Sequence, residues 1–542
     1  MSYCQYEHEP SNFKCRNEAL ESGFCEFHDD KYYLEHPKEI SKKFHELVDE
    51  EQKNPSKYFR CIGYHIVDCN FSNKTFKQNV VFNQSEFSGK TNFTWTTFSK
   101  EASFEDVTFS GKVSFSAAKF LGLAYFQNTK FSEQAAFSGT RFLEDVGFIG
   151  AEFSGAVYFG GTKFSKVANF LNTKFSGLVF FDIAEFSGEA EFIGTKFYGE
   201  TNFASTKFSK VGFKWTKFSR EAWFRGAVFS GETDFTWTKF SGEADFKEAK
   251  FYGIVVFSET KFAEVNFRES LFHKEVNFSG AIFGREVYLG GAKFLQGSNF
   301  RRALFEKPEG VIFEGDLSSF SFYQTDISRT RFDAGVKWQK ADDSDKLEKQ
   351  FKVKEEREIE DALKNSTSID TDVLKLRLED IIGIYRNLKD NYEYYARYND
   401  AGQFFIREME MKRNYKEEKS GGKIIIKKRN WFARNFFATG LYHLTSNYGE
   451  GYERPIIFTT GAMIGSTLFF YFSGNETNLF DAFERTARAL SPTLSLPEPI
   501  SDSTNSEKPL TAVDYLLKVV IVPIAVTLFI AFRRKLERKF RH

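Results

Sequence analysis

Residues 87–131 read FSGKTNFTWTTFSKEASFEDVTFSGKVSFSAAKFLGLAYFQNTKF. Phenylalanine returns in this stretch at alternating steps of six and five residues. The same rhythm runs from Phe71 to Phe305, where 44 positions follow it and only Leu289 is not phenylalanine. Neither the period of a helix nor that of a strand divides such steps. A solenoid is predicted, because each phenylalanine then takes the same place on successive sides of a coil. Phe87, Phe93, Phe98, Phe104 and Phe109 represent this structural ladder.

The residues around each phenylalanine also repeat. A small or β-branched residue stands two positions before it and a polar residue immediately before it, as in Ala190-Glu191-Phe192. Ser-Gly follows in many of the longer steps, and this glycine is expected to take a positive φ at a widened corner. The pattern resembles that of the pentapeptide-repeat family, in its eleven-residue variant. This resemblance implies a right-handed, quadrilateral parallel β-helix.

Four phenylalanines in each coil would give about 11 coils, stacked over about 50 Å at the usual spacing between strands. Rings that repeat at this distance can stack along the axis of the solenoid. The interior should then be filled by side chains, so no substrate cavity is expected inside it.

The chain as a whole is predicted to be an α+β multidomain protein. Helix 37–52 is expected to cover the open first coil, since an exposed parallel edge invites aggregation. The phenylalanine pattern breaks at 307–310 and resumes in steps of five as far as Phe332. The predicted parts are a zinc knuckle (1–35), a capping helix and linker (36–60), the β-helix (61–338), an α-helical collar with a juxtamembrane segment (339–454), and a two-span transmembrane hairpin (455–542).

A candidate metal site precedes the repeats. Cys4, Cys15, Cys25 and His28 are spaced as C-x10-C-x9-C-x2-H. Three thiolates and one imidazole complete a tetrahedral zinc shell, and four protein ligands leave no open position for catalysis. The ending Phe24–His28 resembles that of small zinc knuckles with three cysteines and one histidine. One structural zinc ion is therefore predicted; unmetallated thiols, or His8 as a competing ligand, are the alternatives.

The C-terminal part carries two apolar stretches, Ile456–Phe472 and Tyr515–Phe532; the first contains no charged residue, and the second contains only Lys518, near its start. Both reach the lower length needed to cross a bilayer. Basic residues precede the first stretch and follow the second, which predicts a cell-membrane protein with both termini in the cytoplasm. Residues 372–455 resemble the helical pair and the following segment of some membrane-anchored pentapeptide-repeat proteins. The role of the connecting loop 475–511 stays open.

The charge balance and the sequence motifs argue against several classes of function. Lys and Arg number 74 in the whole chain, equal to Asp and Glu. Between Phe71 and Phe305 we count 28 basic and 24 acidic residues, which argues against the acidic DNA mimicry known among soluble pentapeptide-repeat proteins. Basic and acidic residues alternate without an evident basic stripe, so no nucleic-acid partner is expected. No nucleophile or phosphate-loop motif stands in a suitable context, so the protein is predicted not to be an enzyme.

Trp215 and Trp237 both follow a ladder phenylalanine by two residues and are 22 residues apart, one coil. They should lie one above the other on the outside, and with Tyr252 they form a possible docking patch. The prediction is a membrane-anchored scaffold for protein–protein interaction, with the lipid bilayer and an unidentified protein as partners. The alternative is a channel-like homo-oligomer regulated by the β-helix, although residues 479–496 lack the glycines of a potassium-type filter.

Overall fold

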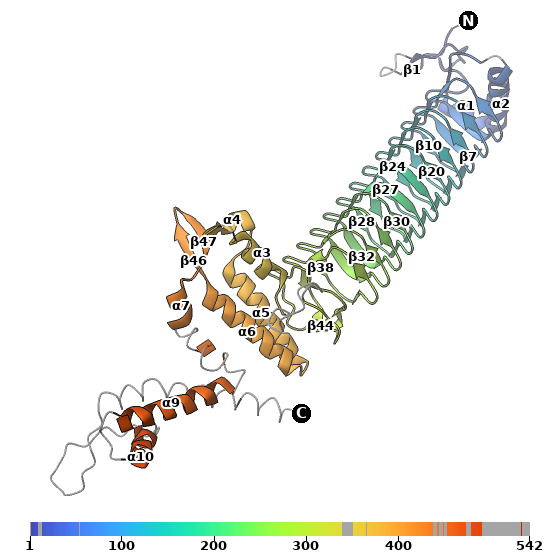
Figure 1. Cartoon of the computed structure of the whole chain (residues 1–542). Helices are drawn as coiled ribbons and strands as arrows, with labels where there is room; N and C mark the ends of the chain where they lie inside the picture. The colour runs from blue at the N-terminus through green and yellow to red at the C-terminus, as the bar shows by residue number, and fades with distance from the viewer. Residues whose placement is uncertain are drawn as a thin grey trace. The chain divides into compact units, whose positions relative to one another are not determined.

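The computed structural model describes residues 2–8, 13–53, 55–338, 351–364, 366–436, 442–443, 448, 453–472, 478–489 and 533. The chain divides into two compact units, Met1–Asp343 and Ser344–His542, and each is considered by itself. The first unit contains the predicted solenoid with its N-terminal cap, and the second is mainly helical (Figure 1).

The solenoid is built from short strands, most of only two residues, between β3 (Tyr58–Arg60) and β42 (Leu304–Phe305). All pairings among them are parallel and join residues one coil apart, so that Phe109 pairs with Phe87 on one side and with Phe131 on the other. The step of 22 residues shortens to 21 where the sequence has consecutive steps of five, as between Phe197 and Phe218. About 12 turns result, which confirms the predicted parallel solenoid. The longer strands that continue around a corner are β4 (His65–Asn70), β7 (Glu86–Asn92), β24 (Glu185–Glu191), β27 (Lys207–Gly212), β32 (Lys239–Asp245) and β35 (Lys261–Asn266).

The phenylalanine side chains fill the interior of the coils. From Phe71 to Phe283 every ladder phenylalanine is at most 2% exposed. Rings one coil apart stack face to face, with 4.9 Å between the centroids of Phe104 and Phe126 and an interplanar angle of 1°. Rings on opposite sides of the lumen meet edge to face, as Phe93 and Phe104 do at 5.6 Å and 83°. Both arrangements are favourable for aromatic rings. The inward ladder predicted at Phe87, Phe93, Phe98, Phe104 and Phe109 is confirmed, with each of the five side chains fully buried.

The corners differ from the prediction in one respect. Positive φ occurs two residues after alternate ladder positions, within the five-residue steps, for example at Asn73 (60°) and Asp106 (56°). Among the Ser-Gly glycines of the longer steps only Gly89 has a positive φ, so that expectation was wrong for the others. They are required for a different reason: a Cβ on Gly177 would lie 2.5 Å from the carbonyl oxygen of Gly155 in the preceding coil. Glycine here allows the backbones of adjacent coils to approach closely.

Buried threonine hydroxyls add a second set of links between coils. The Thr162 Oγ1 hydroxyl donates to the carbonyl oxygen of Phe137, a ladder residue of the previous coil, at 2.7 Å. Each such bond satisfies a polar group that would be costly to bury alone. The same bond is made by Thr96, Thr129, Thr140, Thr173, Thr195, Thr206, Thr216, Thr238 and Thr260.

Both ends of the solenoid are covered. At the N-terminal end, α1 (Asp30–Glu35) leads into α2 (Pro37–Lys53), which buries Ile40, Phe44 and Val48. The ring of Phe44 meets that of Phe71 edge to face at 5.9 Å, so this helix closes the first coil as predicted. At the other end, η2 (Pro308–Gly310) interrupts the ladder before β43 (Ile312–Phe313) and β44 (Arg331–Phe332) pair in parallel. Trp338, 3% exposed, packs on Phe332 and ends the described part of the unit.

The second unit begins with α3 (Lys354–Ala362) and α4 (Thr371–Leu374) and centres on α5 (Leu378–Tyr394) and α6 (Tyr398–Asn414), which pack on each other. The two long helices agree with the helical pair expected within residues 372–455. The antiparallel sheet formed by β45 (Ser368–Asp370), β47 (Lys423–Lys428) and β46 (Tyr415–Ser420) was not predicted. Its hairpin turns at Gly421 and Gly422, and both have the positive φ that the two central residues of a type I′ turn require.

Three further helices are described: α7 (Trp431–Phe436), α9 (Glu453–Phe472) and α10 (Leu479–Ala489). Helix α9 coincides with the first predicted membrane span. Among the described residues, however, we find no helix with both the length and the apolar character that crossing a bilayer requires. The second predicted span, Tyr515–Phe532, lies outside the described residues, as does most of the loop 475–511 beyond α10. The two-span hairpin and the channel alternative therefore stay predictions.

The glycine contact between coils can be tested by substitution. Gly177→Ala should lower the urea midpoint of unfolding, measured by far-UV circular dichroism, because its methyl group would overlap the Gly155 carbonyl group. Gly139→Asn is the matched control: Gly139 has a positive φ and open space around its Cβ position, and Asn73 takes the same turn position three coils earlier. An equal change in both variants would contradict this account of the coil spacing.

Candidate metal centre and interaction surface

The N-terminal residues fold into a small hairpin that carries the predicted ligands. Strands β1 (Glu7–His8) and β2 (Phe13–Lys14) pair antiparallel, and the backbone amide of Cys15 donates to the carbonyl oxygen of Tyr6 at 3.0 Å. Cys25 and His28 lie in one turn, closed by the bond from the His28 amide to the Cys25 carbonyl oxygen at 2.9 Å.

The four predicted ligand residues meet at one point. The ligand atoms of Cys4, Cys15, Cys25 and His28 all lie within 4.8 Å of one another, and all four residues are buried. The Sγ atoms of Cys4 and Cys25 lie 3.4 and 3.2 Å from Nδ1 of His28. This grouping is compatible with a metal site. The alternative ligand His8 is placed in strand β1 and is not part of the group.

The histidine is held in the tautomer that a metal requires. Its Nε2 lies 2.9 Å from the carbonyl oxygen of Ile62, and because a carbonyl oxygen only accepts, Nε2 carries the proton. The lone pair of Nδ1 then faces the three sulfur atoms. An outer hydrogen bond of this kind orients metal-binding histidines generally.

The thiols are crowded in a way that favours a cation. The hydrogen bond with Cys15 and burial together raise the pKa of Cys25 to about 12. Burial also raises the pKa of Cys4, whereas the hydrogen bond from Cys25 lowers that of Cys15. Three thiolates at this distance repel one another, and a bound divalent cation would remove that penalty.

The cluster is docked on the first coil of the solenoid. The ring of Tyr6 stacks on that of His28 at 3.9 Å, and Tyr64 stacks on Phe27 at 4.8 Å. The Asn17 side-chain amide donates to the Tyr64 hydroxyl at 3.1 Å. A cleft of about 730 Å³ opens beside this junction, between the hairpin, α2 and β3.

The outer surface of the solenoid carries the predicted aromatic residues, but not as one patch. Trp215 and Trp237 are 63% and 51% exposed and occupy the same corner of successive coils. Both have a positive φ (55° and 60°), at a position where other coils have Asn172, Gly194 or Gly280. Tyr252 instead follows a ladder residue directly, at another corner, and stacks on His273 at 4.6 Å. The tryptophan pair is therefore a candidate surface without Tyr252.

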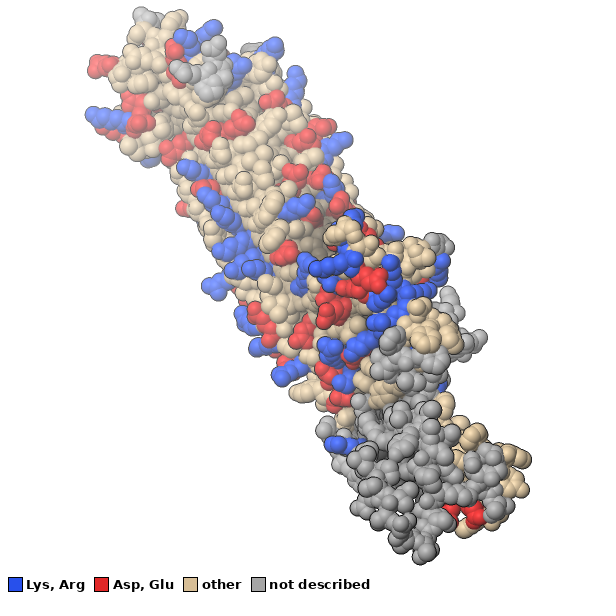
Figure 2. Space-filling model, turned by 90° about the vertical axis from the view of Figure 1, so that its left-hand side faces the viewer, with Lys and Arg blue, Asp and Glu red and all other residues tan. Residues whose placement is uncertain are grey.

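A basic row, which the sequence analysis did not foresee, lies beside the tryptophan pair. Five consecutive coils place a lysine immediately before the same ladder position, and parallel pairing joins each lysine to the next. All five side chains are exposed. Figure 2 shows Lys and Arg side chains at several places along the solenoid, interspersed with Asp and Glu side chains. We call this row the lysine ladder: Lys174, Lys196, Lys217, Lys239 and Lys261.

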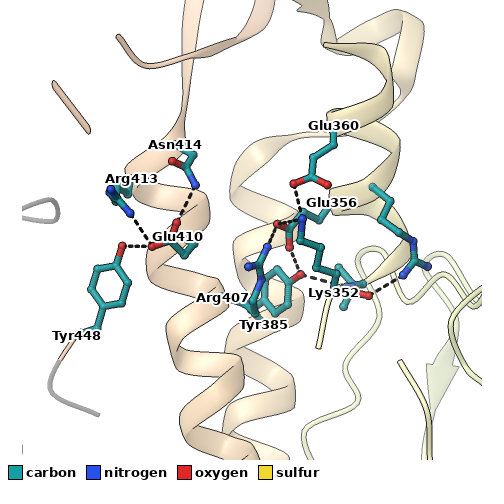
Figure 3. Close-up of polar contacts among 11 residues, drawn as sticks. Lys352, Glu356, Glu360, Tyr385, Arg407, Glu410, Arg413, Asn414 and Tyr448 are labelled. Atoms are coloured by element: carbon teal, nitrogen blue, oxygen red, sulfur yellow. Dashed lines mark hydrogen bonds and ion pairs between the residues drawn. The ribbon is translucent and has the colours of Figure 1, made fainter. Parts of the chain in front are cut away.

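The helical unit holds a buried polar cluster that sequence reasoning missed (Figure 3). Glu356 of α3 forms an ion pair with Arg407 of α6 and accepts a hydrogen bond from the Tyr385 hydroxyl of α5. Burial raises the pKa of Tyr385 well above its usual value, so its hydroxyl stays protonated and donates. The cluster joins three helices, and broken buried ion pairs are strongly destabilising. We interpret it as structural.

A second carboxylate, that of Glu410 on α6, is satisfied in the same way. Glu410 accepts hydrogen bonds from Tyr448 (2.6 Å) and Asn414 (2.9 Å) and pairs with Arg413 at 3.0 Å. Burial alone would raise the pKa of Glu410, but the Tyr448 hydrogen bond and the charges of Arg413 and His443 lower it. This carboxylate therefore ties α6 to the segment that precedes α9.

Comparison with known proteins identifies the repeats. A protein-family model described as pentapeptide repeats (9 copies) matches residues 71–119, 104–152, 115–163, 148–196, 192–236 and 238–282. The chain showed no match among curated proteins and none among solved structures. The six-and-five rhythm of phenylalanine, the parallel stacking of the coils and these matches agree. Residues 71–282 therefore consist of pentapeptide repeats that form a parallel β-solenoid.

Proposed function

We propose that the solenoid is a non-enzymatic scaffold for protein–protein interaction. The observation that carries this proposal is the filled interior: phenylalanine rings occupy the lumen, so partners can meet only the outer faces. Those faces are regular and hydrogen-bonded from coil to coil, and each coil contributes its own outward side chains. Repeat proteins with this construction use such extended surfaces for binding.

The scaffold proposal predicts contacts on the repeats in living cells. Lysine-reactive cross-linking followed by mass spectrometry should join lysines between residues 71 and 305 to other proteins, because these side chains line the outer faces. Denaturing the cell extract before cross-linking is the control and should abolish the links. If the repeats form only links within this chain, while the helical unit captures the partners, the proposal fails.

We also propose that the four N-terminal ligands hold one structural zinc ion. Three sulfur atoms and one imidazole nitrogen are the donor set of a closed zinc site. The hairpin of residues 2–8 and 13–28 has little core of its own, so metal binding would stabilise its fold and its contact with the first coil. The Nδ1 lone pair of His28, directed at the sulfur atoms, supports this proposal.

The zinc proposal predicts one zinc ion in each purified chain by elemental analysis. Cys25→Ser should lower the zinc content well below one, since it removes the most buried ligand. Cys69→Ser is the control, because Cys69 is an equally buried free thiol within the solenoid. Cobalt substitution should add the visible absorption of a tetrahedral thiolate site to the control but not to Cys25→Ser. A zinc-free wild-type protein, or full zinc in Cys25→Ser, would overturn the assignment.

We further propose that the C-terminal part attaches the scaffold to the cell membrane, with the solenoid on the cytoplasmic side. Helix α9 supports this: Ile457, Ile464 and Phe472 are 68%, 57% and 79% exposed, and exposed apolar patches mark contact with lipid or protein. In α7, Trp431 and Phe432 are also exposed, and such side chains suit a bilayer interface.

Membrane attachment predicts that the full chain sediments with membranes and resists extraction by alkaline carbonate. The double variant Ile457→Asp with Ile464→Asp should shift it toward the soluble fraction, because two carboxylates would enter the apolar surface. Val373→Asp is the control, since Val373 is an exposed apolar residue (76%) on α4. Recovery of the unmodified chain in the soluble fraction would contradict this proposal.

A further inference from the structure

The lysine ladder departs from the charge pattern of the rest of its column. In the coil before it, the same position holds Glu152, which pairs with Lys174 at 2.6 Å. From there four lysines follow without a counter-charge: among the described residues Lys196, Lys217, Lys239 and Lys261 form no ion pair. Like charges in register on neighbouring strands lower stability. Alternating charges would fit the fold equally well, so the uniform row needs another explanation.

The adjacent tryptophans also conflict with the preferences of the fold. Trp215 and Trp237 stand two residues before Lys217 and Lys239, on the same coils. A positive φ is unfavourable for a bulky side chain, and more than half of each ring is exposed. The pair therefore contributes little to folding. Backbone strain that brings no gain in folding stability points to a binding role. Tryptophan is also enriched among the residues that contribute most of the binding energy at protein interfaces.

A row of carboxylates that runs parallel to the lysine ladder limits the classes of partner that can bind there. Glu200, Glu221, Glu243 and Glu264 lie three or four residues beyond the lysines of their coils, around the next corner. Burial and the nearby Asp245 and Glu264 carboxylates raise the pKa of Glu243, which shows how closely these negative charges are grouped. A uniformly negative polymer such as a nucleic acid would be attracted by one row and repelled by the other. The favoured partner carries its acidic residues in a single narrow stripe.

The spacing of the ladder suits a helix that lies along the rod. Five lysines at the usual strand separation span about 19 Å. Acidic residues on successive turns of a helix repeat every 5.4 Å or so and cover about 22 Å in four steps, a mismatch that long lysine side chains can absorb. Alternate residues of an extended strand repeat at about 6.7 Å and would cover about 27 Å in four steps, which differs too much from the span of the five lysines.

We propose that the lysine ladder with Trp215 and Trp237 is a docking face for an amphipathic helix of a partner protein. One stripe of this helix carries acidic residues for the lysines, and the neighbouring apolar residues contact the tryptophan rings. The inference rests on the proposed scaffold role and names the partner class for one face of the solenoid.

The test measures binding of a labelled synthetic helical peptide of about 18 residues, long enough to cover the ladder. One peptide carries glutamate in a single stripe beside leucine, and a second has the same composition with the glutamates spread around the helix. Fluorescence anisotropy with the full chain should give at least tenfold tighter binding for the striped peptide. Raising the salt concentration should weaken that binding, because the charges are exposed.

Matched variants locate the site. Replacing Lys196, Lys217, Lys239 and Lys261 with glutamine should weaken binding of the striped peptide at least tenfold, whereas Lys207, Lys250 and Lys293→Gln, on the opposite side of the coils, should not. Trp215→Asn with Trp237→Asn should also weaken binding. Trp95→Asn is its control, since Trp95 is equally exposed at another corner with a positive φ. Circular dichroism checks that each variant is folded; removing like charges should not destabilise the solenoid.

Three results would overturn the inference: equal binding of both peptides, unchanged binding by the glutamine variant, or tighter binding of a single-stranded oligonucleotide or of anionic lipid vesicles to the same lysines. If cellular proteins cross-link to other faces of the repeats while the striped peptide does not bind, the scaffold role stands and only this docking face is rejected.

Discussion

The stacking of phenylalanine rings inside the coils is the interaction on which the rest of the first unit depends. Each ring contacts the rings above and below it and those across the lumen, as Phe104 does with Phe126 and Phe93. The rings fix the register of the backbone, and threonine hydroxyls such as that of Thr162 reinforce it. Because the register is fixed, every outward position also repeats from coil to coil. The rows of surface charges are therefore a direct consequence of the core.

The N-terminal cap covers the edge of the first coil, which would otherwise be an exposed parallel strand edge. Helix α2 covers the rings of the first coil through Phe44, and the cluster of three cysteines and one histidine is joined to the same coil by the bond between His28 and Ile62. One hydrogen bond thus joins the histidine of the cluster to the backbone of the first coil.

Much of this architecture could be predicted from the sequence, because periodic signals are strong. The phenylalanine rhythm predicted the solenoid and its inward rings, and the need to cover an open parallel edge predicted the capping helix. The spacing of Cys4, Cys15, Cys25 and His28 predicted that these four residues meet. Contacts between distant, non-periodic residues could not be predicted. The pairing of Glu356 with Arg407 depends on how three helices pack, and no local pattern encodes it. The close approach at Gly177 depends on the backbone of the neighbouring coil. The preference of glycine for a positive φ at turns, on which the prediction was based, does not take that backbone into account. The lysine ladder was not recognised in the sequence because one coil has 21 residues instead of 22, so a fixed period misaligns Lys196 and Lys217.

The nearest-neighbour pairing of the coils has a consequence for how such a chain can change over time. Each turn contacts only the turns directly before and after it, as the pairing of Phe109 with Phe87 and Phe131 illustrates. Gain or loss of one complete turn would leave every remaining contact intact and alter only the length of the surface rows. The length of a binding face could thus change in evolution by one coil at a time.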